Sequence, residues 1–172
     1  MNHQPEQGQL QQQQQLLNSQ NAQKIQSVLD QYGLKLTVIE FAASTRTAKD
    51  AAEAIGCEVA QIAKSLIFRG KNTQKPVLVI TSGANRVNES KLREYAGEAI
   101  EKADPEFVLL HTGYPIGGVP PIGHATEIEP FIDEDLLQYG AIWAAAGTPN
   151  AVFQLAPADL LKITKGQVIS VK

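Results

Sequence analysis

The sequence predicts a single α+β domain with a mixed or antiparallel β-sheet flanked by helices. Segments with helical spacing alternate along the chain with short apolar or alternating segments typical of strands. Two such strands, residues 63–70 and 75–83, are separated only by the polar residues 71–74, which indicates an antiparallel hairpin. A second short connection joins residues 141–147 to 151–156. These short links disfavour a doubly wound parallel fold, whose strands need long crossovers.

The helices are predicted from apolar spacing and from residues that cap helix ends. In the first, residues 21–33, Ile25, Val28 and Leu29 share one face and Gly33 suits the C-terminal cap. A last helix is predicted at 156–164. The other helices are bounded, in chain order, by Thr47 and Gly56, by Asn88 and Gly97, and by Asp104, with Pro105 at the first helical position.

The strands are predicted from alternating or continuous apolar residues bounded by turn residues. The first follows Gly33 directly and the last closes the chain. The predicted strands are residues 34–41, 63–70, 75–83, 125–133, 141–147, 151–156 and 167–172.

Residues 1–20 differ from the rest of the chain because they are rich in Gln, with five in a row at 11–15. Too few of them are apolar to offset the entropy of ordering, so we expect a disordered or frayed extension before a domain at 21–172. The start of the chain lacks the features of a signal peptide, and no apolar run is long enough to span a membrane. The single cysteine, Cys57, fits a reducing compartment. We therefore expect a cytoplasmic protein without a membrane partner.

Charge is unevenly distributed along the 172 residues, whose formal net charge is −3. Residues 64–93 hold seven basic residues and one acid, whereas residues 94–159 hold eleven acids and one lysine. One interpretation is an anionic partner that meets a basic face. The other is that solvated strand and helix surfaces differ in sign, and the sequence leaves both open.

Most familiar catalytic patterns are absent. The chain has no Gly-rich phosphate loop ending in Lys-Ser/Thr, no dinucleotide fingerprint and no zinc-ligand spacing, so we expect neither a cofactor nor a metal. His111, at the end of a predicted helix, is interpreted as structural or capping, and Cys57 as a small buried hydrophobe. An enzyme of this kind has to rely on backbone groups and a few polar side chains.

Two features suit such chemistry. Lys64 starts an otherwise apolar strand, where it is either a snorkelling strand-end lysine or a fixed cation for a phosphate or a reacting carbonyl. The stretch "GGVPP" follows 53 residues later. Its glycines, Gly117 and Gly118, let backbone amides approach a ligand, while Pro120 and Pro121 stiffen the loop. Alone, this pattern indicates only a rigid loop with exposed donors.

The order of these features resembles the YbaK family, relatives of the editing domain of bacterial prolyl-tRNA synthetases. Four segments carry the resemblance, which runs from about residue 24 to 172: "AKSLIF", "PVLVITSGANRVNESKL", "TGYPIGGVPPIGH" and "AVFQLAPADLLKIT". The family's near-essential lysine falls on Lys64, and its glycine-x-x-x-proline loop falls on Gly117 to Pro121. The resemblance implies a barrel-like sheet and a free-standing aminoacyl-tRNA deacylase, acting on a small mischarged amino acid, with proline tRNA as one candidate.

The resemblance also implies roles for residues. Amides of Gly117 and Gly118 hold the carbonyl or position the water, Lys64 contacts the terminal nucleotide, and the substrate's own 2′-hydroxyl assists. The expected substrate-binding residues are Ser65, Ser82, Val119, Pro120, Pro121 and His124.

Several alternatives stay open. Ser82 lines the amino-acid pocket or is an ordinary strand-end serine, and His124 touches the substrate or hydrogen-bonds to the loop backbone. Asn88 is explained as a helix cap. The expected partners are the acceptor end of aminoacyl-tRNA and an aminoacyl-tRNA synthetase. The rival functions are a non-catalytic module that binds tRNA or a synthetase, and hydrolysis of another small ester.

Overall fold

The computed structural model describes residues 17–172 as one α+β domain with a mixed eight-stranded sheet. Seven strands follow the order β1-β7-β6-β2-β3-β5-β8, and β4 pairs separately with β2. The path runs from β1 to β8 without closing into a barrel. The strands are β1 (Val38–Glu40), β2 (Ile62–Gly70), β3 (Pro76–Ser82), β4 (Ile100–Lys102), β5 (Phe131–Asp133), β6 (Ile142–Ala145), β7 (Ala151–Leu155) and β8 (Gln167–Ile169).

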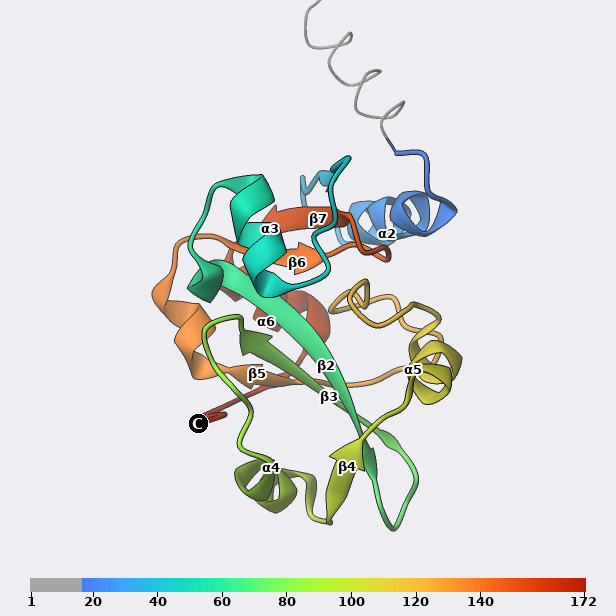
Figure 1. Cartoon of the computed structure of the whole chain (residues 1–172), viewed down its shortest axis with the longest axis vertical. Helices are drawn as coiled ribbons and strands as arrows, with labels where there is room; N and C mark the ends of the chain where they lie inside the picture. The colour runs from blue at the N-terminus through green and yellow to red at the C-terminus, as the bar shows by residue number, and fades with distance from the viewer. Residues whose placement is uncertain (1–16) are drawn as a thin grey trace, which may run out of the picture.

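Helices cover the sheet and its ends (Figure 1). They are α2 (Gln20–Gln31), α3 (Ala48–Ile55), α4 (Glu89–Ala96), α5 (Pro105–Thr112), α6 (Pro157–Thr164) and the short 3-10 helices η1 (Val59–Gln61) and η2 (Glu134–Gln138). Figure 1 shows the β2–β3 hairpin crossing the middle of the molecule, with α5 and the loop after it to one side.

The pairing of β2 leaves a gap that positions the site. One edge of β2 is paired with β3 from Ala63 to Arg69. On its other edge β2 pairs with β6 only through Ile62 and Ala63, and with β4 through residues 68–70. Between these pairings, residues 64–67 have no strand partner on that edge within the described chain. An opening of this kind in a sheet leaves room for a loop and a ligand.

Hydrophobic residues pack on both faces of the hairpin because successive side chains of a strand point to opposite sides. On one face, Ile67 and Ile80 join the main core together with Ile25 and Leu29 of α2. On the other, Phe68 joins a smaller cluster that includes residues of β3, α4 and the C-terminal segment. A third cluster places the alanines of α3 against Ile62 and Trp143, at the start of β2 and on β6.

The predicted fold class is confirmed, and most helix boundaries agree closely with the prediction. Thr47, Asn88 and Asp104 each accept a backbone N–H as N-caps, and Gly56 and Gly97 end their helices in the left-handed region. The strand predictions at 34–41 and 125–133 were too long, because only Val38–Glu40 and Phe131–Asp133 pair with neighbours. Strand β4 was not predicted.

The predicted extension at 1–20 lies mostly outside the described residues. Its last four residues belong to the domain, since Leu17 is buried and Ser19 caps α2. None of the helices within residues 17–172 combines the length and the apolar character that a membrane span requires.

Candidate active site

The loop of residues 114–121, called the Gly-Pro loop below, lies at the opening beside β2. It follows α5, which ends at Gly113 in the left-handed region, and its first residue, Tyr114, is fully buried. The hydroxyl of Thr112 bonds the carbonyl of Val108 at 2.7 Å and the amide of Tyr114 at 3.0 Å, which ties the loop to the helix. The loop therefore leaves α5 in a fixed direction.

Two cavities meet between this loop and β2. The smaller, of about 190 Å³, is lined by β2, β6, the start of α3 and the loop. Its walls are mostly small or apolar side chains, among them Ala48, Ala63 and Ala144. The larger, of about 550 Å³, is lined by β2, the loop after β3, the end of β4 and α5. The residues common to both cavities are Lys64, Ser65, Leu66, Ile116 and Val119.

The two glycines of the loop do different things. Gly117 has φ +88°, a conformation that favours glycine, and no acceptor for its amide occurs within residues 17–172. Gly118 packs against the backbone of Thr148, donates its amide to Pro115 at 2.9 Å and accepts from the amide of Gly147 at 2.8 Å. The amide of Gly118 is thus occupied, contrary to the expectation that both glycines present free donors.

The next amide, that of Val119, also has no acceptor within residues 17–172, and Val119 lines both cavities. Free donors beside the junction of the cavities therefore include the amide of Gly117, in the smaller cavity, and that of Val119, which lines both. Between them, the amide of Gly118 is turned toward Pro115. Two such amides can stabilise negative charge on a carbonyl oxygen.

Lys64 is half-buried on β2, paired with Thr81 across the sheet, and it lines both cavities. No carboxylate within residues 17–172 forms an ion pair with it. Its neighbour Ser65 faces the opposite side of the strand, where its buried hydroxyl has no hydrogen-bond partner. The structure thus brings together the predicted Lys64, Ser65, Gly117 and Val119.

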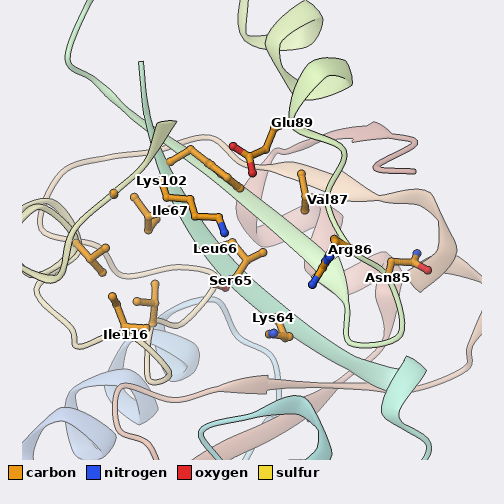
Figure 2. Close-up of a pocket in the computed structure, with 14 residues that line it drawn as sticks. Lys64, Ser65, Leu66, Ile67, Asn85, Arg86, Val87, Glu89, Lys102 and Ile116 are labelled. Atoms are coloured by element: carbon orange, nitrogen blue, oxygen red, sulfur yellow. The ribbon is translucent and has the colours of Figure 1, made fainter. Parts of the chain in front are cut away.

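Three further cations surround the same space. Arg86, on the loop after β3, and Lys102, at the end of β4, line the larger cavity with Lys64 (Figure 2). Arg46 lines the smaller cavity, and its side chain lies over Gly117. Sequence reasoning did not single out Arg46, Arg86 or Lys102. The only signal for Arg86 was its place in the basic run, while Lys102 lies in the acidic stretch.

Four other predicted residues lie away from the cavity junction. Ser82 is buried, and its hydroxyl donates to the carbonyl of Ala60 at 2.8 Å. Pro120 and Pro121 are buried and line neither cavity. His124 bonds the carbonyl of Pro120 through Nε2 at 2.6 Å, and burial lowers the pKa of its imidazole. In this structure His124 supports the loop from behind, so its structural interpretation fits the contacts better.

The remaining titratable candidates have structural surroundings. His111 stacks on Phe107, with 4.3 Å between ring centroids, and its Nδ1 is buried without a partner. Cys57 is partly buried against the α3 cluster, and burial raises the pKa of its thiol. Within residues 17–172 no three His, Cys, Asp or Glu side chains lie together as a metal site requires.

Comparisons with known proteins identify the family of this chain. Residues 42–163 match the aminoacyl-tRNA editing domain, and the chain belongs to this family. It is 34% identical to the Bacillus subtilis "Uncharacterized protein YwhH" over 138 residues, 80% of this chain and 87% of that protein.

Two other relatives carry more informative names. The chain is 31% identical to the Enterococcus faecalis "Putative Cys-tRNA(Pro)/Cys-tRNA(Cys) deacylase EbsC" over 143 residues, 81% of this chain and 87% of that protein. A crystal structure described as that of "a putative trans-editing enzyme for prolyl tRNA synthetase" superposes with a TM-score of 0.84 and 46% identity, covering 90% of this chain and 98% of the other. The family is therefore one of free-standing aminoacyl-tRNA deacylases related to the editing domain of prolyl-tRNA synthetase.

Proposed function

We propose that this protein hydrolyses, in trans, the ester bond of a tRNA mischarged with a small amino acid. The observation that carries the proposal is the meeting of two unlike cavities at Lys64 and the Gly117–Val119 segment. An aminoacyl ester has two unlike halves, an amino acid and a nucleotide, joined at the carbonyl that must react. The junction is the place for that carbonyl.

The smaller cavity suits the amino acid. Its volume of about 190 Å³ and its alanine-lined walls fit a short, uncharged side chain and leave little room for an aromatic one. Binding alone separates amino acids that differ by one methylene by only about 10- to 200-fold, so a hydrolytic second sieve of limited size is useful to a synthetase. The names of two relatives refer to proline tRNA or to prolyl-tRNA synthetase, and we propose mischarged proline tRNA as the substrate of this chain.

The larger cavity suits the terminal nucleotide. Its volume of about 550 Å³ can hold a nucleoside. The residues that line it include three cations, Lys64, Arg86 and Lys102, and one carboxylate, that of Glu89. The resulting positive charge favours the phosphate of RNA. Not every basic residue of 64–93 is available to bind phosphate, since Arg69 is paired with Glu101 at 2.6 Å.

The reaction adds water across the ester. The water oxygen attacks the carbonyl carbon, and negative charge develops on the carbonyl oxygen, where the amides of Gly117 and Val119 can donate to it. Collapse breaks the bond to the ribose oxygen, which takes up a proton, and releases the free amino acid and the tRNA hydroxyl. Lys64 holds the nucleotide and adds positive charge beside the carbonyl. Following the family resemblance, we assign the proton transfer to the substrate's own 2′-hydroxyl; the described residues that line both cavities are Lys64, Ser65, Leu66, Ile116 and Val119.

The test is release of amino acid from a panel of mischarged tRNAs. Wild-type protein should deacylate tRNAs that carry small amino acids, and Lys64→Ala should lower kcat by about 10²- to 10³-fold, as for loss of a transition-state contact. Lys75→Ala is the matched control, because Lys75 is exposed in the β2–β3 turn and lines neither cavity. If no tRNA loses its amino acid faster than in buffer, the proposed deacylase activity is wrong. If Lys64→Ala retains full activity, the site is wrong.

A further inference from the structure

Asp133 is a fully buried carboxylate that the proposed chemistry does not use. Its Oδ2 accepts from the Thr81 hydroxyl at 3.1 Å, the Ser82 amide at 2.9 Å and the Asn85 side-chain amide at 2.8 Å. Its Oδ1 accepts from the amide of Asp135 at 2.9 Å. A buried carboxylate with four donors is well satisfied and holds them rigidly.

Among these donors, Asn85 alone belongs to the segment between β3 and α4, residues 83–88. Its side-chain amide also donates to Asp135 at 2.8 Å, and its backbone amide turns back to the carbonyl of Ser82 at 3.0 Å. One end of the 83–88 segment is therefore fixed to β5 and η2.

The segment is also held on either side of Asn85. The amide of Gly83 donates to Ile62 at 2.8 Å, and that of Asn88 donates to Val171 at 2.7 Å. A Cβ on Gly83 would lie 2.6 Å from the carbonyl oxygen of Val59, so the backbone of Gly83 is packed closely against η1. Arg86 therefore lies in a short segment, residues 83–88, whose backbone is held at both ends.

Arg86 stands on this segment and faces the larger cavity (Figure 2). Its side chain is exposed and has no ion pair or hydrogen bond within residues 17–172. Asp133 and Asp135 instead accept from Asn85, and Asp135 also pairs with Lys172. With no partner inside the described part of the chain, Arg86 is free to meet an anion. Lys64 and Lys102 lie on the β2 and β4 sides of the same cavity.

We propose that Arg86 binds a backbone phosphate at the 3′ end of the RNA, and that the Asn85–Asp133 pair is a positioning device that aims it. The inference rests on the proposed function and adds to it a named phosphate contact and its support. Asp133 would keep three donors without Asn85, so the closure of β3 onto β5 does not need this side chain. What Asn85 adds is a tie to the segment that carries Arg86.

The experiment is a double-mutant cycle of Asn85→Ala and Arg86→Gln, read by binding and by deacylation. The binding probe is an uncharged RNA microhelix that ends in CCA, followed by fluorescence anisotropy at several salt concentrations. Arg93→Gln is the matched control, because Arg93 is exposed on α4 and lines neither cavity. Thermal unfolding of each variant reports folding, and Asn85→Ser replaces Asn85→Ala where that variant is unstable.

Arg86→Gln should raise Kd and KM about tenfold, the effect of losing one charge-assisted hydrogen bond, and leave kcat within about twofold. The slope of log K against log salt should fall by about 0.7, the value for one phosphate of a single strand. Asn85→Ala should reproduce most of the rise in KM, and the double variant should bind no worse than Arg86→Gln. The Arg93→Gln control should bind as wild type does.

Each contrary result has its own meaning. Binding by Arg86→Gln that equals wild type overturns the phosphate contact, as does a wild-type protein that does not bind the microhelix. Additive losses in the cycle show that Asn85, which itself lines the larger cavity, acts independently of Arg86 and overturn the positioning role. Normal binding and a non-additive cycle without deacylation of any charged tRNA would remove the proposed function and leave this inference standing.

Discussion

Replacing Gly118 with alanine should destabilise the fold through a contact that cannot relax easily. A Cβ there would lie 2.8 Å from the carbonyl carbon of Thr148 and 2.9 Å from its Cα and amide nitrogen. These are backbone atoms, so no side-chain rotation relieves the overlap, and overpacking of this kind costs about 1–3 kcal/mol. If the segments around Gly118 and Thr148 move apart to make room, the hydrogen bond from the Gly147 amide to the Gly118 carbonyl, now 2.8 Å, is weakened. Such a bond contributes about 0.5–1.5 kcal/mol.

The free energy of unfolding should therefore fall by about 2–4 kcal/mol, and Tm by about 5–15 °C for a domain of this size. Urea unfolding and a thermal melt measure the two quantities. Gly140→Ala is the control, because a Cβ at Gly140 meets nothing within 4 Å and its φ is not in the left-handed region. It should match wild type or gain a few tenths of a kcal/mol. A Gly118→Ala protein as stable as the control would refute the packing argument.

Three other substitutions test separate parts of the molecule. Burial lowers the pKa of His124 below its ordinary 6.5, so the unfolded chain binds more protons between the folded pKa and 6.5. Stability should fall as the pH drops through that window, and His124→Asn should flatten the dependence in urea unfolding from about pH 8 to about pH 5; an unchanged slope would contradict the assignment. Asp133→Ala leaves the buried amide of Ser82 without its acceptor and the Thr81 hydroxyl with only the Ser82 carbonyl at 3.4 Å, and it should cost about 2–4 kcal/mol of unfolding free energy; a loss below about 0.5 kcal/mol would show that these donors find other partners. Ala144→Val narrows the smaller cavity and should lower kcat/KM more for larger amino acids than for alanine, whereas an equal loss across a panel of charged tRNAs would remove this cavity from amino-acid selection.

The helix ends were predictable because their causes are local. A cap such as Thr47, Asn88 or Asp104 bonds an amide three residues away, and a terminating glycine needs only its own backbone freedom. Strand ends depend on partners far along the chain. Thus residues 34–37 have strand-like alternation but pair with no strand in the described part of the chain, while Ile100–Lys102 form β4 because β2 passes beside them.

The site was predictable in part. Lys64 stands out as a cation in an apolar strand, and Gly117 lies in a loop rich in glycine and proline. The structure places Lys64 in both cavities and Gly117 in the smaller one, and it adds Arg86 and Lys102 in the larger. These two come from a loop and a short strand whose approach to Lys64 is set by the sheet. No spacing in the sequence reports that approach.

The sequence by itself determined the α+β class, the helix boundaries, the lysine and the stiff loop, because composition, periodicity and capping act over a few residues. The tertiary structure alone decided which amides of that loop are free. The amides of Gly117 and Val119 have no acceptor within residues 17–172. The amide of Gly118 donates to the carbonyl of Pro115, and its Cα packs against the backbone of Thr148. Both glycines look alike in the sequence. Their roles differ because a turn orients one amide inward, and because a segment 30 residues further along the chain fills the space beside it.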